Sequence, residues 1–441
     1  MRPLRFSPLR LSSLSQLPWS WPTSLSIHLP HRLRRKLRST RSKIRAMQTP
    51  TSSIAGLEWS CRPSDTLRAL HTHRCTVWDL QYLFLGLLLV GSLAVIESPG
   101  PLVKTLVVSV LLGTLAVPVT CQFFLPFLPI AVYLIFFYAC QFISGEYRPP
   151  IWVRVLPALE NILYGANLSN ILSAHKATAL DVLAWLPYGI LHFGAPFVCS
   201  GLMFIFGPPG TTPVFARAFG YMCITGVFIQ LLFPCAPPWY ENKYGLAPAN
   251  YSMPGSPAGL AAIDRLFGID LYTSPFTASP MVFGAFPSLH SGNATLEALF
   301  MSHVFPRWRP LFVVYTLWLW WATMYLSHHY AVDLVAGASI SALYYFGARA
   351  RWLPRLQPGK LFRWDYDYVE HGDVLSPGAS AYSALDYDLP LYDSSNDAAS
   401  TSAFSSSSSA GPGSASASAV RSPATAEAAD DTSSLGWDRD T

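Results

Sequence analysis

Long apolar stretches recur along the middle of the chain, each near the roughly 20 residues that a helix needs to cross about 30 Å of hydrocarbon. They lie at 79–96, 102–120, 122–143, 180–206, 213–234, 288–305, 310–327 and 331–348. The sequence therefore predicts an all-α integral membrane protein, a polytopic bundle of about eight transmembrane helices. Six or seven crossings are the alternatives, because only a short uncharged link separates 102–120 from 122–143, and this pair could form one crossing and a re-entrant piece.

The sixth stretch, 288–305, is short and carries Ser291, Asn293, Thr295 and Glu297. Polar side chains are costly in contact with lipid, so this helix is expected only inside a bundle. Glu297 follows His290 by two turns. It is either a hydrogen-bonding group in the bundle interior or part of a proton path, and we favour the first.

Charge is scarce and gathered at the two ends. Charged residues make up 12% of the chain, whereas soluble proteins carry about 25%. Residues 1–47 contain eleven Lys and Arg and no acid. This composition is typical of a mitochondrial transit peptide, but a disordered basic tail or a true start at Met47 explains it as well. We predict three parts: a basic cytosolic tail (1–75), a transmembrane catalytic domain (76–363), and an acidic, Ser/Ala-rich, disordered cytosolic tail (364–441).

Lys and Arg also predict the orientation, because short cytosolic loops are enriched in them. Besides the first tail, the basic segments are 306–309 and 349–363. Eight crossings place all of these on the cytosolic side and the long loop 235–283 on the lumenal side. The segment 144–179, also lumenal by this count, carries three basic residues and weakens the bias. Within it, 153–174 has apolar residues at helical spacing, which indicates either an amphipathic helix in the membrane interface or a cap packed on the bundle.

Two polar clusters stand at the lumenal ends of apolar stretches, Phe286-Pro287-Ser288-Leu289-His290-Ser291-Gly292 and Ser327-His328-His329-Tyr330-Ala331-Val332-Asp333. A helical hairpin between them, with legs of similar length, returns His329 to the membrane face that holds His290. Asp333 follows His329 by four residues and shares its helix face, whereas His328 lies five residues away and off that face. His329 is therefore the better partner for Asp333.

These side chains fit phosphoryl transfer. A neutral imidazole can attack phosphorus, and a carboxylate on its other nitrogen fixes the tautomer and stabilises the cation that forms. The second histidine can protonate the departing alkoxide and later accept the proton of the incoming hydroxyl. Backbone N–H groups around Ser288–Ser291, at a helix start, can hold phosphate oxygens. A single histidine would more often be structural, but the full set at two membrane edges favours a catalytic site.

The seven cysteines show no CxxC or Cys/His ligand spacing, so neither a metal site nor a disulfide framework is expected. A transporter or scaffold is disfavoured, because the chain has no evident internal repeat. The residues alone thus predict phosphoryl transfer on a lipid, with a lipid alcohol as acceptor or, in a phosphatase, water.

The motifs P-S-x-H and H-x3-D resemble those of the acid phosphatase and lipid phosphatase (PAP2) superfamily, and this implies a six-helix catalytic core. The match is partial. Leu289 stands where that superfamily has glycine, and Ala322-Thr323 where it has Ser-Arg. Of the opening motif only Arg148-Pro149 remains, with Gln141 in the place of its lysine. Fewer cations for a phosphate favour a phosphodiester substrate over a phosphomonoester.

The wider sequence resembles the fungal inositol phosphorylceramide synthases, the aureobasidin-A resistance family, over about residues 75–365. The resemblance rests on 152–209, 233–242, 255–257, 283–292 and 324–330. It implies a multi-pass Golgi enzyme with a lumenal active site. This enzyme transfers phosphoinositol from phosphatidylinositol to ceramide with release of diacylglycerol, without a metal or other cofactor. It also implies a small regulatory membrane subunit and no nucleic acid partner. The catalytic residues carried over are His290, His329 and Asp333.

Further residues are candidates for substrate binding because they lie at the lumenal edge, and these are Arg148, Ser288, Ser291, Trp239 and Tyr240. Trp239 and Tyr240 could equally be a rigid aromatic anchor in the membrane interface. Sequons begin at Asn167 and Asn250 in predicted lumenal loops, near the membrane or buried. A third begins at Asn293, inside an apolar stretch, where we expect no glycosylation.

Overall fold

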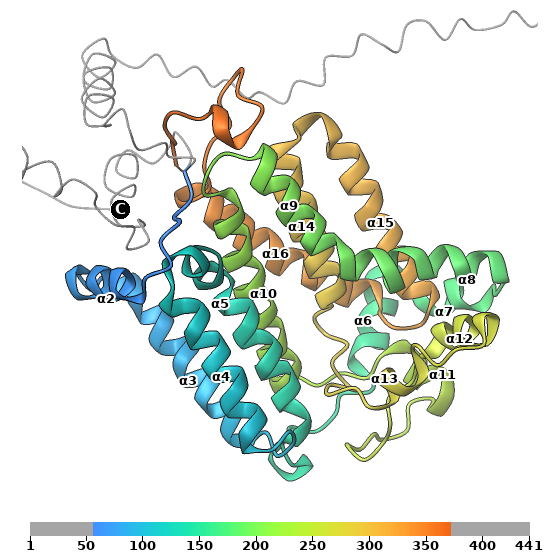
Figure 1. The fold of residues 1–441 in the computed structure, drawn as a ribbon. Coiled ribbons are helices and arrows are strands. Elements are labelled where there is room, and N and C mark those ends of the chain that lie inside the picture. Colours follow the sequence, from blue (N-terminus) through green and yellow to red (C-terminus); the bar gives the residue numbers. More distant parts are fainter. Residues whose placement is uncertain (1–55, 372–441) are drawn as a thin grey trace, which may run out of the picture. The chain divides into compact units, whose positions relative to one another are not determined.

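The computed structural model describes residues 56–371, and the predictions for 1–55 and 372–441 concern residues outside it. The described residues all belong to the first of two compact units, 1–392, and the second unit is 393–441. Within the described range the architecture is helical, and isolated bridges are the only β-type pairings (Figure 1). The predicted all-α class is confirmed.

Each predicted apolar stretch forms a helix. They are α3 (Leu80–Val95), α4 (Pro101–Ala116), α5 (Pro118–Ala139), α8 (Thr178–Trp185) with α9 (His192–Phe206), α10 (Thr211–Leu232), α14 (Leu289–Val304), α15 (Arg309–Tyr325) and α16 (Ala331–Arg351). Five helical segments of the described chain are long and apolar enough to span a membrane: Val77–Val95, Pro118–Phe142, Thr178–Phe206, Thr211–Leu232 and Ala331–Arg351. The remaining three, α4, α14 and α15, have 16, 16 and 17 residues. α4 and α5 are separate helices that pack together, each beginning with a proline, which suits the first helical turn.

α14 lies inside the bundle, as its polar residues predict. It packs against α9, α15 and α16, and α10 joins this group to α5, α3 and α4 (Figure 1). Two close approaches depend on glycine. A Cβ at Gly337 of α16 would lie 2.1 Å from the carbonyl oxygen of Ser288, and one at Gly220 of α10 would lie 2.5 Å from the side chain of Pro129 in α5. Any side chain at either position would push apart the helices that hold the site.

Glu297 lies inside the bundle, in the middle of α14. Its side chain is buried in α14, and its Oε1 has no hydrogen-bond partner within residues 56–371. A buried polar group without a partner costs about 1–3 kcal/mol.

Short helices cover the end of the bundle where the polar clusters lie. They are α6 (Val155–Tyr164), α7 (Leu168–Ala174), α11 (Pro238–Tyr244), α12 (Ala261–Phe267) and α13 (Thr273–Thr277). α6 and α7 occupy the segment 153–174 and act as a cap. Leu156 is buried beside Tyr330, and the Glu160 carboxylate accepts hydrogen bonds from the backbone N–H groups of Ala331 and Val332, each at 3.2 Å. Glu160 thereby satisfies free N–H groups at the start of α16.

Ordered structure extends past both predicted tail boundaries. Before residue 75, α2 (Pro63–Thr72) forms, and the backbone N–H of Glu58 donates to Oε1 of Gln122 in α5 at 3.1 Å. After residue 363, the chain folds back. The N–H of Arg355 donates to the carbonyl of Glu370 at 2.8 Å, and the Tyr366 side chain is buried. The hydrogen-bonded chain therefore includes 56–75 and 364–371 in addition to the predicted membrane domain.

This extension sharpens a truncation experiment. A variant consisting of residues 56–371 is expected to keep turnover per inserted molecule within about twofold of the full chain, because the removed segments are polar and Ser/Pro- or Ser/Ala-rich. The matched control is 56–363, which lacks the buried Tyr366 and the Arg355–Glu370 hydrogen bond. We expect this control to melt at a lower temperature in detergent. Loss of turnover by a well-inserted 56–371 variant would contradict the prediction.

Candidate active site

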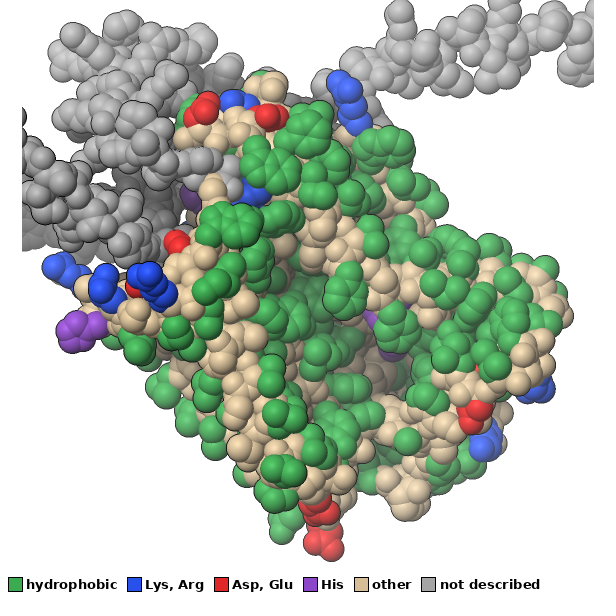
Figure 2. Space-filling model, viewed as in Figure 1, with side chains coloured by type: hydrophobic (Ala, Val, Ile, Leu, Met, Phe, Trp, Pro, Cys, Tyr) green, Lys and Arg blue, Asp and Glu red, His purple; other side chains and the backbone are tan. Residues whose placement is uncertain are grey.

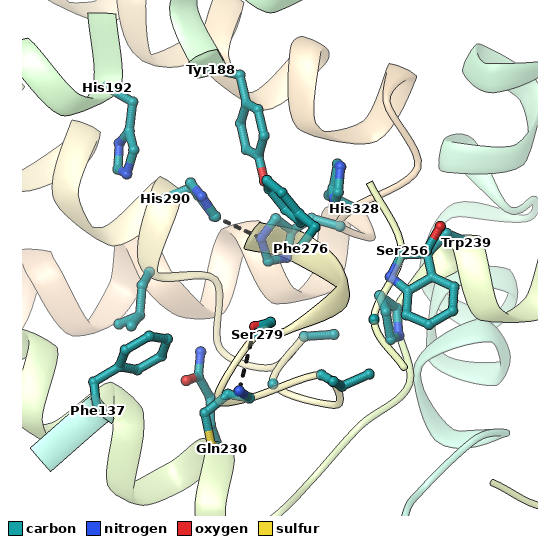
Figure 3. A pocket seen from close by; sticks show the side chains of 18 of the residues that line it. Phe137, Tyr188, His192, Gln230, Trp239, Ser256, Phe276, Ser279, His290 and His328 are labelled. Carbon is teal, nitrogen blue, oxygen red and sulfur yellow. Dashed lines mark hydrogen bonds between the residues drawn. The ribbon is translucent and has the colours of Figure 1, made fainter. Parts of the chain in front are cut away.

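The three predicted catalytic side chains form one hydrogen-bonded line. His290 lies in the first turn of α14, His329 in the turn before α16, and Asp333 in the first turn of α16. His329 Nδ1 lies 2.9 Å from Asp333 Oδ2, and His329 Nε2 lies 3.0 Å from His290 Nδ1 (dashed line from His290 in Figure 3). The hairpin of α14 and α15 thus returns His329 to His290, as its leg lengths predict.

The donors and acceptors in this line follow from the carboxylate. An ionised Asp333 only accepts hydrogen bonds, so Nδ1 of His329 carries a proton and donates it. Nε2 of His329 then bears the lone pair, which accepts the N–H of His290 Nδ1 in this structure. His329 and Asp333 are 5% and 0% exposed, and burial lowers the pKa of His329, which favours the neutral, nucleophilic imidazole.

Ser288 and Ser291 hold the backbone of this site together. Ser288 Oγ accepts the N–H of Ser291 at 3.3 Å and caps α14, while the Ser288 N–H donates to the carbonyl of Asp333 at 3.0 Å. Ser291 Oγ donates to the carbonyl of Leu334 at 2.6 Å. Both serines are fully buried. The structure therefore places these two substrate-binding candidates between α14 and α16, where they link the starts of the two helices.

A cavity of about 290 Å³ opens beside the two histidines. Tyr188, His192, Gln230, Phe276 and His328 surround it, with Ser256, Ser279 and Trp239 on the side of the loop segments (Figure 3). Tyr133 and Phe137 of α5 complete the wall. In the space-filling view, a hollow with a histidine inside it is rimmed largely by hydrophobic side chains (Figure 2). The site is thus reached through an apolar face of the bundle.

Of the remaining substrate-binding candidates, only Trp239 lines this cavity. Tyr240 is fully buried, and its hydroxyl donates to the carbonyl of Ala247 at 3.1 Å. Arg148 bonds to backbone carbonyls, through Nε to Ile143 at 3.0 Å and through its terminal nitrogen to Cys140, and it lies over the Tyr251 ring. Arg148 therefore fastens the chain after α5, and the structure does not bring it to the cavity.

Three aromatic rings at the site were not among the predicted residues. The ring centroids of His192 and Tyr188 each lie 4.7 Å from that of His290, and Tyr188 also stacks on His328 at 5.2 Å. His328 Nε2 donates to the carbonyl of Pro257 at 3.2 Å. A π-helical turn, Leu186–Leu191, carries Tyr188 and leads into His192. A histidine inside the apolar stretch 180–206 was the one available signal, because ionisable residues in such stretches are usually functional.

The lining of the cavity contains no Lys, Arg, Asp or Glu among the described residues. Its polar side chains are four histidines, Gln230, Asn293 and two serines, together with the polar ends of Tyr133, Tyr188 and Trp239. Within residues 56–371 no group of three His, Cys, Asp or Glu side chains is arranged to hold a metal ion. The histidines and the neutral polar side chains are therefore the groups available to contact a phosphate in this cavity.

A family comparison covers the part of the chain that forms this site. Residues 151–346 match the model of the PAP2 superfamily, and this range includes α6 to α15, most of α16 and all three residues of the hydrogen-bonded line. Helices α3 to α5 lie outside the matched range, although α5 contributes Tyr133 and Phe137 to the cavity. No solved structure matches the chain.

Several similar curated proteins are named as synthases of inositol-containing ceramides. The catalytic subunit aur1 of inositol phosphorylceramide synthase from Schizosaccharomyces pombe is 55% identical over 324 residues, 74% of this chain and 77% of that protein. The inositol phosphorylceramide synthase of Candida albicans is 44% identical over 74% of this chain and 69% of its own length. A phosphoinositol dihydroceramide synthase of Bacteroides thetaiotaomicron is 30% identical over 44% of this chain and 66% of its own. With 55% identity over 74% of its length, the chain belongs to the inositol phosphorylceramide synthase family within the PAP2 superfamily.

Proposed function

We propose that this protein transfers phosphoinositol from phosphatidylinositol to the primary hydroxyl of ceramide and releases diacylglycerol. The observation that carries the proposal is the hydrogen-bonded line from His290 through His329 to Asp333 at the wall of a cavity that opens through an apolar face. The printed names of the relatives supply the two substrates.

In the first step, Nε2 of His329 attacks the phosphorus of phosphatidylinositol. The N–P bond forms as the bond from phosphorus to the diacylglycerol oxygen breaks, and a doubly protonated His290 gives its proton to that oxygen. The Nδ1–H of His329 stays on Asp333, whose negative charge stabilises the imidazolium of the phosphorylated histidine. For this step the phosphate must enter between Nε2 of His329 and Nδ1 of His290, which are 3.0 Å apart without substrate.

In the second step, the ceramide hydroxyl attacks the same phosphorus. The now neutral His290 accepts the hydroxyl proton, the new O–P bond forms, and the N–P bond to His329 breaks. Both histidines return to their starting states, so the cycle needs no external proton and no further reactant. The single negative charge of a phosphodiester is matched by a protonated His290, which fits a cavity without Lys or Arg.

The apolar flank of the cavity suits lipid substrates that arrive from the bilayer. Phe193 of α9 lines the cavity and is 65% exposed, and Phe197 on the next turn is 78% exposed. Both side chains would face lipid tails in a membrane. We therefore assign the entry of diacylglycerol and ceramide chains to the side of the site between α9 and α5.

Location and assembly are part of the same proposal. We place the protein in the Golgi membrane with the site facing the lumen, on the basis of the family resemblance and of the basic segments at the other end of the helices. A small regulatory membrane subunit is proposed as partner. The names of the S. pombe and Saccharomyces cerevisiae relatives, which specify a catalytic subunit, support it.

The test supplies fluorescent ceramide and phosphatidylinositol to membranes from cells that express the protein. We expect a new fluorescent lipid with the mass of inositol phosphorylceramide, formed only when both substrates are present. A lipid phosphatase would instead release diacylglycerol and a water-soluble phosphate at the same rate without ceramide. That result, or a ceramide product of any other mass, would overturn the proposed function.

A further inference from the structure

We infer that Asn293 binds the polar backbone of the acceptor lipid, the amide and neighbouring hydroxyl of ceramide, and so favours ceramide as acceptor. The inference rests on the proposed function and names a residue that selects the substrate of the same site. Asn293 follows His290 by three residues on α14 and lines the same cavity. Asn293 is buried, and only 8% of its surface remains exposed.

One end of this amide is engaged and the other is not. Asn293 Oδ1 accepts the S–H of Cys223 in α10 at 3.3 Å, whereas Nδ2 has no hydrogen-bond partner among the described residues. A thiol is a weak donor and by itself does not require an amide as its partner. Because Asn293 lines the cavity and its Nδ2 bonds to no other described group, this N–H₂ group can donate to a ligand there. The Asn293 side chain is therefore anchored at one end by Cys223 and offers its other end to the cavity.

The depth of Asn293 indicates which part of the lipid it meets. Along α14, three residues correspond to about 4.5 Å, directed from His290 into the bundle. Its partner Cys223 precedes Gln230 by seven residues on α10, and Gln230 lines the cavity near the end of that helix. Cys223 therefore lies about 10 Å deeper in the bundle than Gln230 does. A headgroup that projects toward the lumen would meet Gln230 and the loop serines, and Asn293 lies on the side of the lipid chains.

Ceramide carries suitable groups at this depth. Its reacting hydroxyl is on the first carbon, its amide on the second and another hydroxyl on the third. When the first oxygen lies between His290 and His329, the amide carbonyl or the third-carbon hydroxyl falls one helical turn deeper, near Nδ2 of Asn293. The departing diacylglycerol presents ester oxygens there, which are weaker acceptors than an amide carbonyl. The same N–H bond therefore favours ceramide over diacylglycerol.

The experiment pairs changes in the enzyme with changes in the acceptor. Asn293→Leu keeps the approximate size of the side chain and removes its hydrogen bonds, and Asn293→Ala guards against a clash. Each is assayed with ceramide, with an analogue that lacks the third-carbon hydroxyl, and with an analogue in which an ether replaces the amide. We expect kcat/KM for ceramide to fall about tenfold, the worth of one hydrogen bond. The KM for phosphatidylinositol should change far less.

The decisive comparison is a double-mutant cycle in which one change is the substitution of Asn293 and the other is the removal of a polar group from the acceptor lipid. On the analogue that lacks the bonded group, the Asn293 substitutions should cost much less than they cost on ceramide. Cys223→Ala is the matched control. It removes the thiol that touches Oδ1 and leaves the amide in place, so acceptor selectivity should persist.

Equal losses on all three acceptors, or a Cys223→Ala variant that reproduces the Asn293 effect, would overturn the inference and leave Asn293 a packing residue. Failure of the proposed function has a different signature. In that case the unmodified protein itself forms no ceramide-dependent product. The thermal midpoint of each variant in detergent, measured in parallel, separates a loss of folded protein from a loss of acceptor binding.

Discussion

Alanine in place of His329 is expected to abolish phosphoinositol transfer, and His290→Ala is expected to come close to doing so. Without His329 no nucleophile remains on Asp333, and loss of a catalytic nucleophile costs about 10⁴-fold or more in kcat. His290→Ala removes the acid and base, which contributes about 10²–10⁴-fold. His290 and His329 are 3.0 Å apart and form one unit, so the double variant should be little worse than the single ones.

The measurement is turnover per molecule of inserted protein, with thermal midpoints compared in detergent. Both side chains line a cavity, so their truncation should leave the fold intact. A useful control is His303→Ala, which lies at the far end of α14 and bonds to the carbonyl of Pro354 at 2.8 Å. This variant should keep its activity. Substantial turnover by either active-site variant would refute the assignment of the site.

Asp333→Asn is expected to lower kcat by orders of magnitude, about 10²–10⁴-fold, with little change in KM. The amide can still accept the Nδ1–H of His329 through its oxygen, but it carries no charge to stabilise the phosphorylated imidazolium, and its N–H₂ end can select the wrong tautomer. Because Asp333 is fully buried, water cannot replace the lost charge.

The Asp333→Asn result also distinguishes a catalytic from a structural role. The backbone carbonyl of Asp333, and not its side chain, accepts the hydrogen bond from Ser288, so the substitution leaves the link between α14 and α16 in place. A trapping experiment adds a second readout. With phosphatidylinositol alone, the unmodified protein should release up to one diacylglycerol per site, and the variant should do so far more slowly. Near-normal activity would make Asp333 a residue that only begins α16.

The sequence alone determined the helices and one half of the site. Long apolar stretches have no stable state in a bilayer other than the hydrogen-bonded helix, so their positions follow from composition. The His329–Asp333 pair is a spacing of four residues at the start of a helix, and its geometry is local. The meeting of His290 with His329 required only two helical legs of similar length.

Tertiary structure decided which polar side chains face the cavity. The sequence positions of Ser288 and Ser291 do not reveal that both residues bond to backbone carbonyls of α16, Ser288 to Asp333 and Ser291 to Leu334. Arg148 is engaged by carbonyls of the preceding turns and not by the cavity. The tail boundaries depend likewise on contacts such as Glu58 with Gln122, which join residues far apart in the chain.

His192, Tyr188 and Asn293 are the converse case, because they lie at the cavity although the sequence did not predict them as site residues. A π-helical turn and the packing of α9 on α14 bring the first two rings to His290, and the closeness of α10 leaves one end of the Asn293 amide facing the cavity. Hydropathy and local spacing determine where a helix runs and which residues share its face. The partner of each face is set by long-range packing among several helices, which no single segment of the sequence encodes.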